Sequence, residues 1–325
     1  MEVSVPNGNL RYIILVYAAI DRAQALGYPI PHKRVAAWTD DLSPCHFECT
    51  DWQQKLAEAL LLASLVVFSG RNSTPYLEKC FPRDTACTWQ NFLIMARDII
   101  KRRGIVDGDD GDDPECGFLI RWLARLDVFG TFSDLSLGPP LPLDAYWPWD
   151  ITKDLKVDYL LGTSSICTSI LAKIANVLCR RRQSLNVRDC PVSERESLKL
   201  LLRTLESLKS PQMECLMCPG LSWAVSFNLM TISRILQATG KAYLKQLIGQ
   251  RSYDTDVLTI ASNVAGLAAK PSVNACIFLP MFVAGALTQD TVYLNLFRPD
   301  LERLERLGME RVSSPCLNST PLVAE

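Results

Sequence analysis

Apolar residues recur along the chain at the three-to-four-residue spacing of an amphipathic helix. The clearest stripe consists of five leucines, Leu198, Leu201, Leu202, Leu205 and Leu208. A second stripe has a strict spacing of four and consists of Ile166, Ile170, Ile174 and Leu178. It ends in three consecutive arginines at 180–182, where cations suit the negative end of a helix dipole. Both stripes predict helices with one buried face.

The same spacing predicts further helices, which cover 9–26, 50–70, 89–104, 117–129, 222–238, 254–268, 273–288 and 290–308. Capping boxes at Thr50 with Gln53 and at Ser193 with Glu196 mark two helix starts. Pro280 and Pro299 predict kinks or breaks. Neither a strand pair nor a fixed repeat is evident, so we expect an all-α fold, a single large irregular domain of roughly ten packed helices.

Two linkers separate these helices. The first, residues 104–117, is acidic and Gly-rich, whereas the second contains the stiff Pro139–Pro142 stretch, held at the surface by Tyr146, Trp147 and Trp149. Neither has the character of a boundary between independent domains. We therefore expect one helical domain over residues 1–312 and a disordered C-terminal tail over 313–325.

Composition and charge limit the classes of protein to which the chain could belong. Apolar residues make up 48% and charged residues 21%, and the formal net charge is −1. A DNA-binding module should carry a basic surplus, because neutralisation of phosphates supplies most of the affinity. The apolar run Tyr12–Ile20 is shorter than a membrane span. With no recognisable signal peptide, the 12 scattered cysteines are expected to be reduced thiols of a cytosolic or nuclear protein.

An acidic run resembles the aspartate motif of isoprenoid synthases, which hold magnesium with carboxylates projecting from helices. It comprises Asp109, Asp110, Asp112 and Asp113. Glycines at 108 and 111 interrupt the run, and no second metal motif follows downstream, so a solvated loop is the preferred interpretation. A remote alternative is a magnesium-dependent enzyme using Asp109, Asp110 and Asp113, whose pyrophosphate release from prenyl diphosphates would be lost on Asp109→Ala.

Other candidate chemistry is weaker. Cys215 and Cys218 form the one Cys-x-x-Cys pair, but two further zinc ligands at suitable spacing are missing. Cys45 and Cys49 flank His46, yet sequence neighbours rarely position their side chains for proton transfer. We therefore predict no catalytic, cofactor-binding or metal-binding residues, no cofactor and no enzymatic activity.

Asp127 is the one charged residue in the apolar stretch Leu126–Phe129. A buried carboxylate needs a partner. Arg121, Arg125 and backbone amides that follow Gly130 are the candidates, and their role would be architectural.

The order of five segments resembles the fungal-specific transcription factor domain of the second type, the effector region of fungal binuclear zinc-cluster regulators. The segments are LLLASLVVFSG at 60–70, the helix 89–104, RWLARLDVFGTFS at 121–133, DYLLG at 158–162 with the helix after it, and LPMFVAG at 279–285. Together they cover roughly residues 10–310. The six closely spaced cysteines of that family's zinc cluster are absent from this sequence.

The resemblance implies the effector domain of a transcription regulator that controls metabolic or biosynthetic-cluster genes. It implies location in the nucleus. The cytoplasm is the alternative location, because no strong import signal stands out. It implies protein partners, either the transcription machinery or a related regulator. Direct DNA binding is not expected, because the zinc cluster is missing. A truncated gene or a true paralogue would both give this pattern. The alternative is a helical interaction module that dimerises with, or titrates, a full-length regulator. The resemblance supplies no catalytic residues, and it neither implies nor excludes a small-molecule effector.

Overall fold

The protein folds into helices in the computed structural model, which confirms the predicted all-α class. The structure describes residues 8–26, 51–69, 88–103, 114–146, 157–158, 160–183, 191–208, 223–267, 279–281, 283–288, 295 and 298. The chain divides into two compact units. The first comprises residues 1–126 with 303–310, and the second comprises residues 127–302 with 311–325.

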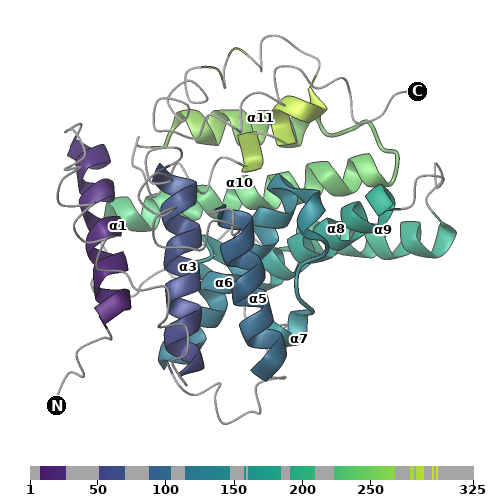
Figure 1. The fold of residues 1–325 in the computed structure, drawn as a ribbon. Coiled ribbons are helices and arrows are strands. Elements are labelled where there is room, and N and C mark those ends of the chain that lie inside the picture. The colour runs from purple at the N-terminus through teal and green to yellow at the C-terminus, as the bar shows by residue number, and fades with distance from the viewer. Residues whose placement is uncertain are drawn as a thin grey trace. The chain divides into compact units, whose positions relative to one another are not determined.

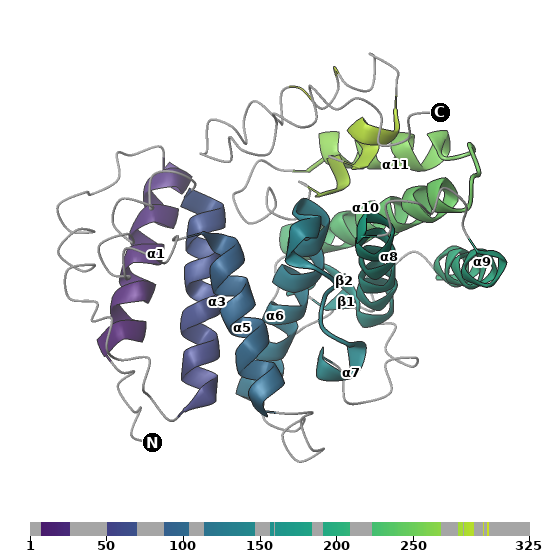
Figure 2. The same cartoon turned by 45° about the vertical axis from the view of Figure 1, so that its right-hand side comes forward.

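The first unit is built on α1 (Gly8–Leu26), α3 (Trp52–Ser69), α5 (Trp89–Arg103) and the first turns of α6 (Pro114–Ser133). Helix α3 packs against both α1 and α5, and the three helices lie side by side in Figures 1 and 2. This central place explains why the second half of α3 is apolar on every side. One cluster of its buried core consists of Ile13, Val16, Leu62, Ala63, Leu65 and Phe92.

The second unit is built around one long helix, α10 (Trp223–Leu247), as Figures 1 and 2 show. The helices α8 (Ser165–Gln183), α9 (Val192–Ser207) and α11 (Asp254–Ala265) all pack on it. The smaller elements are the 3-10 helix η4 (Leu135–Leu137), α7 (Leu143–Tyr146) and the strands β1 (Val157–Asp158) and β2 (Thr163–Ser164). Because its neighbours meet on it, α10 is the scaffold of this unit.

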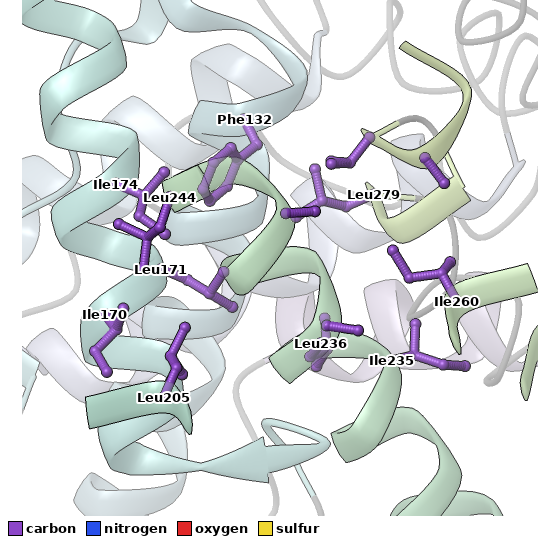
Figure 3. Close-up of a cluster of buried hydrophobic side chains, with 14 of the residues drawn as sticks. Phe132, Ile170, Leu171, Ile174, Leu205, Ile235, Leu236, Leu244, Ile260 and Leu279 are labelled. Carbon is purple, nitrogen blue, oxygen red and sulfur yellow. The ribbon is translucent and has the colours of Figure 1, made fainter. Parts of the chain in front are cut away.

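The core of the second unit lies where α8, α9, α10 and α11 converge (Figure 3). Of the predicted α8 stripe, Ile170 and Ile174 are buried, while Ile166 and Leu178 are partly buried against the same core. Leu198, Leu202 and Leu205 of α9 are buried, while Leu201 and Leu208 are partly buried against the same core. From the late segment, Leu279, Met281, Val283, Ala284 and Leu287 are buried in it too. Both sequence stripes therefore face the core.

Two helices continue beyond their predicted ends and pass through glycines. Helix α6 passes Gly130 and ends at Ser133, because Thr131 and Phe132 are buried in the next turn. Helix α10 passes Gly240 and ends at Leu247. At Gly240 an added Cβ would lie 2.9 Å from Cδ1 of Leu205, so this glycine allows a close approach of α9. The predicted helix ends at 129 and 238 are wrong, because buried residues continue beyond both of them.

One of the two predicted capping boxes is replaced by another helix start. Helix α9 begins at Val192 after Pro191, with no side-chain cap, and Ser193 lies inside its first turn, so the prediction for Ser193 is wrong. At α3 the carboxylate of Asp51 accepts a hydrogen bond of 2.9 Å from the amide of Gln53. Thr50 lies outside the described residues.

A short antiparallel strand pair that no sequence pattern indicated joins β1 to β2. Asp158 Oδ1 accepts hydrogen bonds from the amides of Leu160 and Leu161, at 2.7 and 3.0 Å. Gly162 closes the turn with φ of 72°, and a Cβ there would lie 2.9 Å from Cγ2 of Ile232. The ladder has only two residue pairs, too few for an alternating pattern to be visible.

Candidate functional site

The buried carboxylate of Asp127 is held by the proline-rich segment that follows α6. The Tyr146 hydroxyl donates a hydrogen bond to Asp127 Oδ2, and the Leu141 amide donates to the same oxygen at 3.0 Å. The Leu141 amide also lies 3.0 Å from the Tyr146 hydroxyl oxygen. All three groups are buried, and the side chains of Asp127 and Tyr146 are fully so. Asp127, Leu141 and Tyr146 are referred to below as the Asp127 anchor.

The anchor confirms that a backbone amide after Gly130 is a partner of Asp127. Tyr146 was not predicted as a partner, although the sequence places it in the segment expected to lie against the surface. Its hydroxyl needs an acceptor once the ring is buried, and Asp127 is the nearby carboxylate. The anchor is architecture, because both groups are enclosed and satisfied by the fold.

Ion pairs join helix ends in the second unit. Arg181 Nη2 lies 2.9 Å from Glu194 Oε1 and 3.5 Å from the carbonyl oxygen of Leu247, so it joins the ends of α8 and α10 to the start of α9. Lys245 Nζ lies 2.7 Å from Asp256 Oδ2, and these side chains are only 15% and 10% exposed. The pair fixes α11 on α10.

A small polar cluster lies where β2 and α8 meet α10. The hydroxyl oxygens of Thr163 and Ser233 are 3.1 Å apart, and the Cys167 amide donates to Ser164 Oγ at 3.3 Å. Burial raises the pKa of the Cys167 thiol to about 11, against the opposing effects of a hydrogen bond with Thr163 and the charge of Lys241. A thiol held protonated at neutral pH is a poor nucleophile.

An exposed aromatic pair lies at the start of α10. The rings of Trp223 and Phe227 are stacked, with centroids 5.4 Å apart and an interplanar angle of 17°. Trp223 is 66% exposed and Phe227 is 40% exposed. Large aromatic side chains left in solvent typically mark interaction surfaces. Among the described residues this pair is the clearest such surface, and the amphipathic pattern of α10 did not predict it.

The residues weighed for chemistry at the outset lie largely outside the described part of the chain. This holds for the two histidines, His32 and His46, for Asp109, Asp110 and Asp113, and for Cys45, Cys49, Cys215 and Cys218. Among the residues that are described, no group of three His, Cys, Asp or Glu side chains is placed to hold a metal ion.

The described architecture is that of an all-helical scaffold whose buried polar groups stabilise its fold. The chain matches the model of the fungal specific transcription factor domain over residues 39–314. This match spans most of the chain, and the chain therefore belongs to that family, as the five ordered segments predicted. No curated protein and no solved structure matches it.

Membership places the chain among regulators of transcription, and the family is a transcription factor domain rather than an enzyme class. None of the helices in the described ranges is long and apolar enough to cross a bilayer.

Proposed function

We propose that the chain is the effector part of a transcription regulator that acts in the nucleus through protein partners and does not contact DNA itself. The observation that carries the proposal is the family match over residues 39–314. A formal net charge of −1 and the lack of six closely spaced cysteines in the sequence support a role without direct DNA contact. Metabolic or biosynthetic-cluster genes are its targets.

A reporter assay tests the proposal. The full chain is fused to a heterologous DNA-binding domain and expressed in a fungal host whose reporter carries the matching sites. We expect reporter output to change at least about fivefold, up or down, relative to the DNA-binding domain alone. Output equal to that control, with the fusion present in the nucleus at the same level, would sink the proposal.

A second role is favoured by the exposed Trp223–Phe227 pair. In this role the chain is an interaction module that dimerises with, or titrates, a full-length relative. Light scattering of the purified chain measures self-association directly. A strictly monomeric chain that also leaves the output of a co-expressed relative unchanged would count against this role.

A further inference from the structure

The aromatic pair at the start of α10 continues into a line of cations on the same face. Phe227, Arg234 and Lys241 follow one another at intervals of seven residues, and Trp223 lies one turn before Phe227. Seven residues are close to two full turns, so these side chains project in nearly the same direction, with successive heptad positions roughly 10 Å apart. Trp223, Phe227, Arg234 and Lys241 are referred to below as the α10 stripe.

The stripe is narrow and accessible. Arg234 is exposed and Lys241 is half-buried, whereas Met230 and Ala238, which flank the line on the helix surface, are buried. Within residues 229–240 Arg234 is the one exposed position, and near the start of α10 Ala224 and Val225 are exposed beside the aromatic pair. Within the described part of the chain, neither Arg234 nor Lys241 forms a salt bridge, whereas Lys245, four residues after Lys241, is paired with Asp256.

The charge of the stripe selects the chemistry of its partner. Helix α10 has 25 residues, and its charged residues are Arg234, Lys241 and Lys245, with no acidic residue. Two cations that form no salt bridge with any described residue, in line with two exposed aromatic rings, complement a surface that carries carboxylates at one end and apolar side chains at the other. The heptad spacing matches an opposing helix, in which acidic residues seven positions apart face the cations.

We infer that the α10 stripe is a docking surface for an acidic amphipathic helix of a partner protein. Two acidic side chains of that helix, seven residues apart, pair with Arg234 and Lys241, and its apolar side chains cover Trp223 and Phe227. The stripe spans roughly 27 Å, the length of about 18 helical residues. An interface of this size is small, so the complex is transient, with affinity in the micromolar range. The inference rests on the proposed function for its premise that the chain works through protein partners.

A binding measurement tests the inference. The probe is a fluorescently labelled helical peptide of about 20 residues. It carries two glutamates seven positions apart. On the same face, one leucine lies a heptad beyond the second glutamate, and another leucine lies one further turn along. The control peptide has lysine in place of both glutamates. We expect the full chain to bind the acidic peptide with micromolar affinity that weakens as salt is raised, and not to bind the control.

Two double variants locate the site. In Arg234→Glu/Lys241→Glu we expect binding to weaken at least about tenfold. The matched control is Arg195→Glu/Arg203→Glu, which makes the same change of net charge at two exposed positions of α9 and should keep binding within about twofold. Trp223→Ala/Phe227→Ala should weaken binding without lowering the unfolding midpoint, since both rings are exposed. Absence of binding to the acidic peptide, or equal losses in both charge variants, would overturn the inference.

Single-stranded nucleic acid is the competing ligand class, because aromatic rings and cations also bind bases and phosphates. If an oligonucleotide binds the chain and Arg234→Glu/Lys241→Glu abolishes that binding, the surface serves nucleic acid and the inference fails. The reporter assay separates the two proposals. A wild-type fusion that regulates, together with an equally active Arg234→Glu/Lys241→Glu fusion, refutes the stripe and leaves the proposed function intact. An inactive wild-type fusion refutes the proposed function. The peptide-binding measurement then still tests the docking surface on α10 independently.

Discussion

Asp127 has no access to water, so the hydrogen bonds of its carboxylate come from donors within the fold. The Tyr146 hydroxyl and the Leu141 amide both donate to Oδ2, and both belong to the segment that follows α6. A buried donor or acceptor that loses its partner costs more than the hydrogen bond contributes, because water cannot replace the partner. The Asp127 anchor therefore couples the proline-rich segment to the end of α6.

Replacing Tyr146 by Phe tests this coupling. The variant keeps the buried ring and removes one donor to a buried carboxylate, so we expect the free energy of unfolding to fall by about 2 kcal/mol. Urea denaturation followed by circular dichroism measures the change. Tyr253→Phe is the control, because Tyr253 is half-buried and its hydroxyl lies outside the anchor. Equal stability of Tyr146→Phe and wild type would contradict the coupling.

The buried thiol of Cys167 gives the folded state a dependence on alkaline pH. Its pKa is raised by burial from the ordinary value of 9.0 to about 11. Protons are therefore held more tightly in the folded state, and this contribution to stability is complete below about pH 9 and is lost as pH rises toward 11. The full loss corresponds to about 2–3 kcal/mol.

Comparison of wild type with Cys167→Ala isolates this effect from the other groups that titrate at high pH. We expect wild type to lose more stability than Cys167→Ala between about pH 9 and 11, while the difference between the two stays constant from about pH 7 to 8.5. Urea midpoints at each pH provide the measurement. Parallel pH profiles across the whole range would show that the thiol titrates alike in the folded and unfolded chain.

At the scale of the elements, two helical glycines should respond to alanine in opposite ways. At Gly240 a Cβ would lie 2.9 Å from Cδ1 of Leu205 and 3.5 Å from Cδ2 of Leu171, and both leucines are fully buried. At Gly117 it would lie 3.4 Å from Nη1 of Arg121, which is close to ordinary van der Waals contact. We expect Gly117→Ala to stabilise by about 0.5–1 kcal/mol through helix propensity.

For Gly240→Ala we expect a loss of about 1 kcal/mol, because overpacking the crossing outweighs the gain in helix propensity. Denaturant unfolding of both variants measures the two signs. Adding Leu205→Ala should reduce the penalty of Gly240→Ala, since it removes the atom that the new Cβ meets. A stabilised Gly240→Ala variant would show that α9 can retreat from α10 at little cost.

These glycines also explain how far the sequence could predict the elements. The leucine stripe of α9 and the isoleucine stripe of α8 predicted buried faces correctly, because apolar periodicity is local information. The continuation of α10 through Gly240 was not predicted, because the reason for this glycine is a packed neighbour distant in sequence, Leu205 of α9. The partner Tyr146 and the exposed α10 stripe depend on tertiary packing in the same way. The apolar pattern of α10 alone does not reveal which of its faces stays open.

At the scale of the whole molecule, the described cores are closed by apolar side chains, hydrogen bonds and ion pairs. We therefore expect removal of divalent metal with a chelator to leave the thermal unfolding midpoint unchanged, within about 1 °C, when followed by circular dichroism. Urea-denatured chain refolded with and without zinc serves as the control. A fall in the midpoint with chelator would reveal a structural metal held by residues outside the described ranges, with Cys215 and Cys218 as the first to substitute.

The central place of α10 also bears on synthesis of the chain. Helices α8 and α9 end at Gln183 and Ser207, whereas the scaffold that covers their apolar faces is complete only at Leu247. At ordinary translation rates of about 5–20 residues per second, the ribosome needs several more seconds to deliver that helix. During this interval the nascent chain presents two uncovered leucine- and isoleucine-rich stripes. We therefore expect chaperones that bind nascent chains to act on this protein during that interval, which ends when α10 leaves the exit tunnel.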